Sequence, residues 1–421
     1  MQIRRYEMDS KLRRVVVTGI GVISPVGLNI DECWSNLTAG VHGIAPITLF
    51  DTEGYKAKLA AEVKGFNPRD YMEKADVLRS DRYAQFAVAS ACQAMAESGL
   101  EGTLPPERIA VYFGSGIGGI RTFTDEHNKL LNRGPNRVSP YFVPMMIANM
   151  AAGMIAIRFN CRGAAMPAVT ACASGSNAIG EALRAIRHGY ADAAITGGAE
   201  AAINECGIAG FVNMQALSVS TDPDAASLPF DKRRAGFVIG EGAAALVLEE
   251  YEHAVSRGAK IYGEVCGYGS TCDAYHITAP RPDASGGAAA MKEALSEAGY
   301  QDGERVYVNA HGTGTPLNDT AETIAIKDAL GEEAARRAVI SSTKSMTGHM
   351  LGAAGAIEAI ACLKALETGI VPPTANLYEP DPECDLNYAP LKAVEFEADI
   401  ALSNSLGFGG HNACLAFRKV Q

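Results

Sequence analysis

Short apolar runs alternate along the chain with longer segments rich in glycine and alanine. Val15, Val16 and Val17 form one apolar run that Gly19 ends, and residues 108–113 form another. Short apolar runs bounded by glycine are typical of buried β-strands. The pattern therefore predicts strands at both places, with helices between them.

The pattern of strand followed by helix occurs in both halves of the chain. Residues 175–189 predict a helix, because apolar residues recur there at the spacing of one helical face and a glycine supplies the C-terminal stop. A strand-like run follows at residues 193–196. Later, residues 307–310 and 339–342 predict strands, and residues 351–367 predict a helix that a glycine again ends.

Segments of the second half also resemble segments of the first. Residues 352–369 align with residues 175–189 as helices of small residues, and residues 409–417 resemble residues 240–248. Two repeats are too few for a solenoid, so they favour a duplicated α/β unit with its chemistry where the halves meet. The predicted halves are residues 14–258 and 259–421.

Composition and charge narrow the function classes. The chain has 421 residues, of which 48% are hydrophobic, so it can bury a large core. Its formal net charge of −11 gives no electrostatic support to non-specific nucleic-acid binding. An acidic partner would need a local basic patch.

The sequence predicts a cytoplasmic protein. No uninterrupted apolar stretch approaches the ~18 residues of a membrane span. Residues 1–14 carry several basic residues, but no apolar segment of a secretory signal follows them. The ten cysteines are scattered without a CxxC pair, which indicates free thiols and not disulfides or a regular metal site.

Cys172 stands where an extended stretch leads into the predicted helix. The first turn of a helix offers unpaired N–H groups and the positive end of the dipole, and both stabilise a thiolate nucleophile. The alternative is a small buried side chain, which is the expected role of most of the other nine cysteines. Position alone does not decide between the two.

Two histidines follow predicted strands in matching loops of the two halves. His311 directly follows a strand and precedes the residues Gly-Thr-Gly-Thr-Pro, and His349 precedes the next helix. One histidine is more often structural than catalytic, but two in matching loops favour function. Lys344 lies in the same turn as His349, and by itself it would be interpreted as a surface lysine.

Two glycine-rich segments have both a functional and a structural interpretation. Residues 404–411 provide backbone N–H groups that could face an oxyanion, or simply a tight turn before the last strand. Residues 114–119 fit the dinucleotide pattern G-x-G-x-x-G. However, the acidic residue expected about twenty positions later is missing, so we interpret this match as accidental.

These motifs together resemble the β-ketoacyl-[acyl carrier protein] synthases of the thiolase superfamily, and most of all synthase II. The resemblance runs from about Arg14 to the C-terminus. It implies a homodimer whose subunits are five-layered α-β-α-β-α bodies of two similar halves. The motifs that carry it are residues 170–175 (TACASG), 309–316 (NAHGTGTP), 342–349 (STKSMTGH) and 403–412 (SNSLGFGGHN).

The resemblance implies a decarboxylative Claisen condensation with acyl carrier protein as partner. Cys172 would accept the acyl group, and His311 and His349 would promote decarboxylation of malonyl-carrier protein and stabilise the enolate. The N–H groups of Cys172 and Phe408 would form the oxyanion hole, with Phe408 also acting as a gate. Lys344 would position this network with Glu322.

Further roles follow from the same resemblance. Ile117 would line an acyl tunnel near the dimer interface, and Thr278, Thr313 and Thr315 would bind the malonyl arm or phosphopantetheine. No redox or organic cofactor is expected. A structural Na⁺ or K⁺ would be held by Asn309, Glu358, Ser403 and Asn404.

The chain departs from the family pattern at two places. Many synthases II have serine where this chain has Gly314, and glycine occurs there in polyketide ketosynthases. Residues 73–79 carry few cations for a carrier-docking segment. A type II polyketide ketosynthase is therefore the main alternative, ahead of a thiolase or a non-catalytic chain-length subunit. The candidate docking residues are Lys64, Lys74, Arg79, Arg133 and Arg137.

Overall fold

A computed structural model describes residues 12–420 and contains one large sheet. Its strand order is β10-β9-β13-β14-β8-β1-β7-β6-β4-β5. In chain order the strands are β1 (Val15–Ile23), β4 (Ile109–Gly114), β5 (Ala165–Ala168), β6 (Ala193–Glu200), β7 (Gly242–Glu250), β8 (Gly263–Cys272), β9 (Val306–Asn309), β10 (Val339–Ser341), β13 (Ile400–Gly407) and β14 (His411–Arg418). Two small sheets pair β2 (Ile44–Pro46) with β3 (Leu59–Ala61) and β11 (Ile370–Val371) with β12 (Val394–Glu395).

The two halves of the large sheet have the same topology. In each half the strands lie in the order third, second, fourth, fifth, first along the chain, and the two first strands, β1 and β8, meet at the centre. Val16 and Val17 of β1 pair there with Glu264 and Gly263 of β8. The duplicated α/β unit that the sequence predicted is therefore confirmed. The boundary at residues 258 and 259 stays a prediction.

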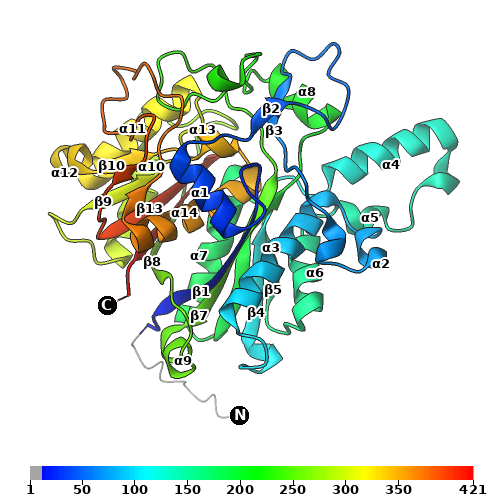
Figure 1. Ribbon diagram of the computed structural model, residues 1–421, viewed down its shortest axis with the longest axis horizontal. Coiled ribbons are helices and arrows are strands. Elements are labelled where there is room, and N and C mark those ends of the chain that lie inside the picture. Colours follow the sequence, from blue (N-terminus) through cyan, green and yellow to red (C-terminus); the bar gives the residue numbers. More distant parts are fainter. Residues whose placement is uncertain (1–11, 421) are drawn as a thin grey trace.

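Helices cover both faces of each half and give the predicted five layers (Figure 1). The inner helices α7 and α14 share one core with the inward side chains of β1, β7, β9 and β14. Helices α3 and α6 pack on the outer face of the first half, and α10 and α11 pack on the outer face of the second. These helices are α3 (Arg82–Ser98), α6 (Met150–Phe159), α7 (Ser174–Arg187), α10 (Ser285–Glu297), α11 (Pro316–Leu330) and α14 (Ala354–Thr368).

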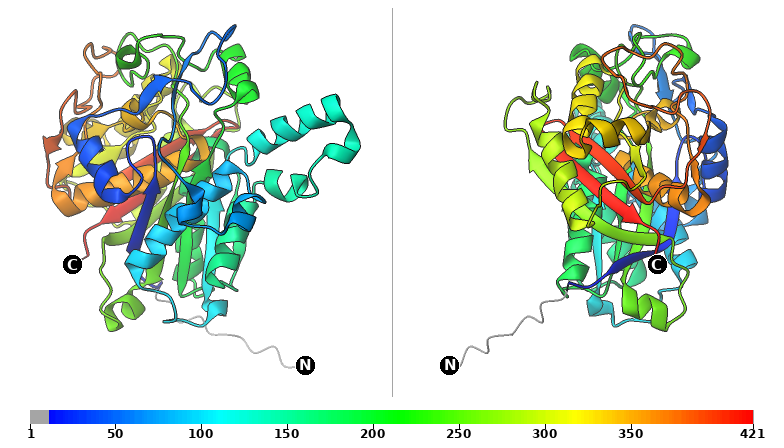
Figure 2. Two further views of the ribbon diagram at one scale, coloured as in Figure 1. Left: turned by 45° about the vertical axis from the view of Figure 1, so that its right-hand side comes forward. Right: turned by 90° about the vertical axis from the view of Figure 1, so that its left-hand side faces the viewer.

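One excursion projects from this body (Figure 2, left). It follows β4 and consists of α4 (Ile120–Arg133) and α5 (Phe142–Met146), joined by residues 134–141. The remaining α-helices are α1 (Ile30–Ala39), α2 (Lys74–Val77), α8 (Glu205–Asn213), α9 (Tyr251–Ser256), α12 (Glu332–Arg337) and α13 (Lys344–Thr347). Single 3₁₀ turns are η1 (Pro68–Asp70), η2 (Pro106–Arg108), η3 (Pro135–Arg137), η4 (Ala171–Ala173), η5 (Pro223–Ala225) and η6 (Leu351–Ala353).

The two inner helices begin and end much as the sequence predicted. Each follows a 3₁₀ turn, η4 before α7 and η6 before α14. Gly369 ends α14 with a left-handed φ of 69°, and Gly189 has φ 76° just after α7. Glycine suits both positions because side chains disfavour this backbone conformation. Within residues 12–420 no helix is long and apolar enough to cross a membrane. The cytoplasmic location stays a prediction.

Candidate active site

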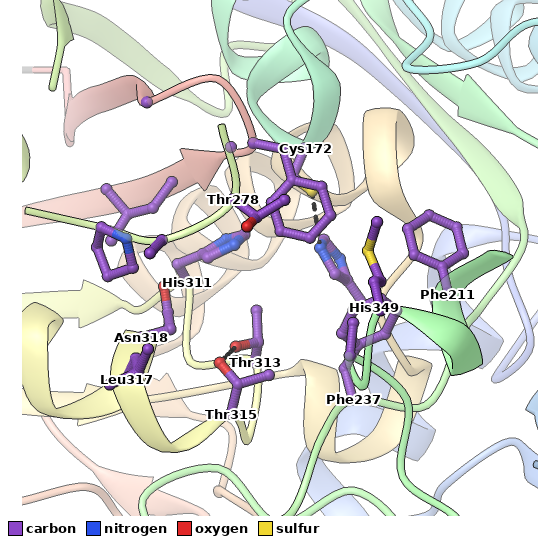
Figure 3. Close-up of a pocket in the computed structure, with 18 of the residues that line it drawn as sticks. Cys172, Phe211, Phe237, Thr278, His311, Thr313, Thr315, Leu317, Asn318 and His349 are labelled. Carbon is purple, nitrogen blue, oxygen red and sulfur yellow. Dashed lines mark hydrogen bonds between the residues drawn. The ribbon is translucent and has the colours of Figure 1, made fainter. Parts of the chain in front are cut away.

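A pocket of about 390 Å³ opens where the two halves meet. Cys172 and Phe237 come from the first half, and His311, His349 and Phe408 come from the second. The pocket lies beyond the ends of strands, because His311 follows β9 and Phe408 lies in the turn between β13 and β14. Cys172, His311 and His349 point toward one another (Figure 3). The sulfur and one nitrogen of each ring lie within 4.8 Å of one another.

Cys172 lies in η4 at the entrance to α7 and is 7% exposed. Burial raises the pKa of its thiol to about 12, while the charge of Lys344 and the backbone N–H of Phe408 lower it. The position of Cys172 before a helix left open whether it is a nucleophile or a small buried residue, and in the structure its burial keeps the pKa of the thiol high. The thiol keeps its proton at rest and needs a base when it attacks.

His349 is placed to be that base. Its Nε2 atom lies 3.1 Å from Cys172 Sγ, and both groups are buried. Burial and then the charge of Lys344 hold the pKa of His349 well below its usual range. The imidazole is therefore neutral near pH 7 and can accept the thiol proton.

The first half of the chain holds His349 although the residue belongs to the second. Its backbone N–H donates to Val238 O at 2.7 Å, and its carbonyl accepts from Gly240 N at 2.9 Å. The imidazole also packs edge-on against Phe237, with ring centroids 5.0 Å apart. Phe237 was not singled out from the sequence, because nothing in the chain order places it beside His349.

His311 is a second neutral imidazole in the same pocket. Its ring centroid lies 5.2 Å from that of His349 and the two planes are nearly perpendicular. Burial, then the charges of Lys344 and His349, hold the pKa of His311 well below its usual range. Each neutral ring has one N–H group that can donate a hydrogen bond to a developing oxyanion, and two neutral rings do not repel each other as two imidazolium ions would.

A buried carboxylate fixes the loop that carries His311. Glu322 accepts hydrogen bonds from the backbone N–H groups of His311 and Gly312, both at 2.7 Å. Gly312 has φ 36°, and a Cβ there would lie only 2.6 Å from the side chain of Ser342. Asn404 Nδ2 donates to the same carboxylate at 3.2 Å. Glu322 thus positions the imidazole through its backbone.

Lys344, which the family resemblance placed in one positioning network with Glu322, forms its direct ion pair with a different carboxylate. Lys344 Nζ forms an ion pair with Glu358, and both side chains are 1% exposed. The interpretation of Lys344 as a surface residue is wrong for the same reason. Glu358 lies on α14, one helical layer away from α11, which carries Glu322. The positive charge of Lys344 lies close enough to the two histidines to lower the pKa of both.

Four buried side-chain oxygens, one of them on Glu358, have no hydrogen-bond partner within residues 12–420. They are buried and belong to the four side chains that the sequence predicted as a cation site: Asn309 Oδ1, Glu358 Oε2, Ser403 Oγ and Asn404 Oδ1. Asn309 and Ser403 are direct partners on neighbouring strands. Unpaired buried oxygens suit a hard monovalent cation, so the residues present fit this group.

The threonines predicted to bind substrate all line the Cys172 pocket. Thr313 and Thr315 lie in the His311 loop with their hydroxyls 2.9 Å apart, and Thr278 contributes from an exposed loop. Asp273 and Asn412, which sequence reasoning did not assign, join that loop to β14 through a 2.8 Å hydrogen bond. Their spacing in the chain gave no signal of this contact.

The glycine-rich tail serves as both a turn and a donor of N–H groups. Residues 408–410 connect β13 to β14, as the structural interpretation required. Gly407 approaches the nucleophile closely, since a Cβ there would lie 2.9 Å from Thr170 O and 3.3 Å from Cys172 N. The approach leaves the backbone N–H of Phe408 within hydrogen-bonding reach of the Cys172 thiol.

Ile117 and the candidate docking cations lie outside this pocket. Ile117 is 37% exposed in the single chain and does not line the space around Cys172. The five docking candidates are all exposed, and the guanidinium of Arg79 lies 4.9 Å from the ring centroid of Tyr141. The docking candidates are Lys64, Lys74, Arg79, Arg133 and Arg137.

Two family models match most of the chain. The model described as "Beta-ketoacyl synthase, N-terminal domain" matches residues 12–254. The model described as "Beta-ketoacyl synthase, C-terminal domain" matches residues 262–378. The N-terminal match precedes the C-terminal match along the chain.

Curated relatives and solved structures agree with these matches. The 3-oxoacyl-[acyl-carrier-protein] synthase 2 of Synechocystis sp. is 51% identical over 97% of this chain and 99% of the relative. The Staphylococcus aureus protein of the same name is 48% identical over 98% of this chain and all of the relative. A β-ketoacyl synthase structure from Burkholderia phymatum superposes with a TM-score of 0.90 at 36% identity, over 97% of this chain and 100% of that one. The ishigamide ketosynthase/chain length factor gives 0.92 at 38% identity, with the same coverage. On this similarity the chain belongs to the β-ketoacyl synthase family.

Proposed function

We propose that this enzyme lengthens acyl chains by condensing an acyl thioester on Cys172 with malonyl-acyl carrier protein. The observation that carries the proposal is the buried thiol with two neutral imidazoles in one pocket. The relatives named 3-oxoacyl-[acyl-carrier-protein] synthase 2 support fatty-acid elongation as the pathway.

The first half-reaction is acyl transfer. Cys172 Sγ attacks the carbonyl carbon of acyl-carrier protein while its proton passes to His349 Nε2, 3.1 Å away. The N–H groups of Cys172 and Phe408 stabilise the oxyanion. The carbon–sulfur bond to the carrier then breaks, and the carrier thiol leaves with that proton.

The second half-reaction is decarboxylation and carbon–carbon bond formation. Malonyl-carrier protein loses CO₂, and the electron pair of the broken bond forms an enolate whose oxygen accepts hydrogen bonds from His311 and from His349 in its Nε2-protonated tautomer. The enolate carbon attacks the acyl carbonyl on Cys172, and the Cys172 thiolate leaves and takes a proton from solvent. Decarboxylation supplies the carbanion, so the step uses neither a strong base nor an organic cofactor.

A product assay tests this proposal. The enzyme is incubated with acyl-carrier protein and malonyl-carrier protein, and the products are weighed by mass spectrometry. We expect β-ketoacyl-carrier protein and one CO₂ for each product. Condensation of two acyl-CoA thioesters without CO₂ release would indicate a thiolase and overturn the proposal.

A type II polyketide ketosynthase remains the second candidate. Gly314 favours it, as does the similarity to a structure described as a type II PKS acyl-carrier protein in complex with its ketosynthase. That structure has 34% identity to this chain and a TM-score of 0.89, over 98% of this chain and 100% of that one. Activity of the purified chain alone on saturated primers supports fatty-acid elongation. A requirement for a second, different subunit supports the polyketide pathway.

The proposal includes a structural monovalent cation. Asn309, Glu358, Ser403 and Asn404 would hold Na⁺ or K⁺ through the four unpaired oxygens described above. Such an ion would supply positive charge beside Glu358, which forms an ion pair with Lys344. These residues would then keep β9, β13 and α14 in register behind His311.

The proposed homodimer has a suitable surface at the end of the sheet. β5 is the last strand, and its only neighbour in the described sheet is β4. Met166 on β5 and Val169 just beyond it are each 53% exposed. An open strand edge with apolar side chains favours pairing with a second copy. We expect twice the mass of one chain in solution and a monomer for Met166→Asp. A wild-type monomer would contradict the proposal.

Ile117 is expected to limit acyl length if the partner completes a tunnel over it. A phenylalanine there would overpack such a tunnel, which costs about 1–3 kcal/mol in packed apolar sites. Ile117→Phe should therefore slow acylation by long primers and spare short ones, measured as acyl-enzyme formation. Equal loss at all chain lengths would assign Ile117 a structural role.

Carrier-protein docking is expected to depend on Arg133 and Arg137, two exposed cations at and after the end of α4. Carrier proteins of this family's pathway are acidic, and salt shortens the Debye length from about 10 Å at 0.1 M to about 3 Å at 1 M. Reversing both to glutamate should raise KM for carrier-bound substrates and flatten its salt dependence. The rate with a small pantetheine thioester is the control. If that rate falls equally, the arginines do not dock the carrier.

A further inference from the structure

Glu200, the last residue of β6, is a fully buried carboxylate that no step of the mechanism uses. It accepts four hydrogen bonds. Ser115 Oγ and Ile117 N donate to Oε1 at 3.1 and 3.2 Å. Gly116 N and Gly352 N donate to Oε2 at 2.7 and 3.0 Å. Within the described part of the chain, no lysine or arginine forms an ion pair with it.

One arm of this network holds the tunnel loop, which we define as residues 115–118. This loop belongs to the glycine-rich sequence whose match to a dinucleotide-binding pattern looked accidental. Its backbone N–H groups do converge on an anion, but the anion is Glu200 of the same chain. Gly116 permits the approach, because a Cβ there would lie 2.9 Å from Glu200 Oε2.

The other arm holds the histidine loop, which we define as residues 349–352. Gly352 donates to the carboxylate, and the preceding Leu351 has φ 46° and lines the Cys172 pocket. A Cβ on Gly352 would lie 2.4 Å from Gly116 N, so the two loops touch directly across Glu200. The strained Leu351 directly precedes this anchor, which indicates that the anchor fixes the loop.

A buried carboxylate without an ion pair is costly to maintain, and burial raises the pKa of Glu200 to about 7. This cost is explained if the fold needs an acceptor for N–H groups from two loops at once. The two oxygens divide this work. Oε1 binds only the tunnel loop, whereas Oε2 bridges the tunnel loop to the histidine loop.

We propose that Glu200 is a positioning residue that clamps the tunnel loop to the histidine loop, so that the acyl-binding wall at Ile117 and the imidazole of His349 are set together. The inference rests on the proposed function, since it assigns Ile117 to acyl binding and His349 to decarboxylation. It adds a coupling between these two residues. A change in the position of the tunnel loop also shifts the position of His349, because the carboxylate of Glu200 binds both loops.

Glu200→Gln tests the clamp with little change of volume. The amide keeps one acceptor oxygen and turns the other into a donor that faces N–H groups, so one arm must break. We expect CO₂ release and short-primer acylation, which both use His349, to fall together by about tenfold, and long-primer acylation, which also uses the tunnel wall, to fall further. Acyl-enzyme formation and CO₂ are measured separately by mass spectrometry and isotope release.

Thr196→Val is the matched control on the same strand. Thr196 is also buried in β6, and its hydroxyl has no partner, so this nearly isosteric change should leave both half-reactions unchanged. If Glu200→Gln lowers all rates by one common factor, Glu200 is merely structural and the proposal fails.

Ser115→Ala tests transmission from one side only. The Ser115 hydroxyl touches the tunnel arm and not the histidine loop. A clamp predicts that Ser115→Ala lowers CO₂ release as well as acylation by long primers. Loss of long-primer acylation with normal CO₂ release would overturn the coupling. The activity of the wild-type enzyme in both assays tests the proposed function itself. A wild-type enzyme that neither forms an acyl-enzyme nor releases CO₂ would overturn the proposed function, whereas the variants overturn only the clamp.

Discussion

Cys172→Ala is expected to abolish acyl-enzyme formation and to lower condensation by roughly 10⁴-fold or more, as loss of a catalytic nucleophile typically does. Among the ten cysteines, only Cys172 combines an opening into the pocket with a histidine nitrogen 3.1 Å from its sulfur. Alanine keeps the local fold, because the site is already packed among small residues. Rates of condensation are measured with acyl- and malonyl-carrier protein.

Cys206→Ala and Cys272→Ala are the controls, because these two cysteines are exposed and react more readily with solvent reagents. Both variants should condense at the wild-type rate. Condensation by Cys172→Ala at a rate near wild type would remove the covalent step from the mechanism.

His311→Ala and His349→Ala are expected to lower CO₂ release by about 10²–10³-fold, the usual cost of losing one oxyanion donor. The two variants should differ in the first half-reaction. His349 contacts the thiol, so His349→Ala should also slow acylation, whereas His311→Ala should acylate at nearly the wild-type rate. This difference goes beyond what the sequence predicted, which treated the two histidines alike.

Burst measurements of acyl-enzyme and of released CO₂ separate the two half-reactions. Lys364→Ala is a control for side-chain loss on α14, because Lys364 pairs with Glu367 at the surface away from the pocket. Normal CO₂ release by both histidine variants would contradict the assignment of the enolate to these imidazoles.

The fold was predictable because its signals are local or repeated. Apolar runs located β1, β4 and β6, and the resemblance between residues 175–189 and 352–369 indicated two copies of one unit. The prediction that Gly19 ends the first strand is wrong, because β1 continues through this glycine to Ile23. Because the two halves are similar, the strand order of the first half recurs in the second. The nucleophile and both histidines were found because each stands in a distinctive motif at a strand end.

What the sequence could not provide are contacts between distant buried groups. Lys344 pairs with Glu358 and not with Glu322, because the choice depends on how α14 and α11 pack around β9. The high pKa of the Cys172 thiol follows from its burial, which the residues around it in the sequence do not reveal. Glu200 comes after Gly197, Gly198 and Ala199 at the end of β6. No sequence motif at this position predicts that its carboxylate accepts four hydrogen bonds.

The most direct test of the central claim is a peptide-level mass measurement of one turnover. The enzyme is loaded with acyl-carrier protein, digested, and compared with a sample first chased with malonyl-carrier protein. We predict that the acyl mass lies on the peptide containing Cys172 and disappears in the chase, with one CO₂ and one β-ketoacyl product for each acyl group lost. An acyl group on another residue, or one that stays on Cys172 while product forms, would contradict the account.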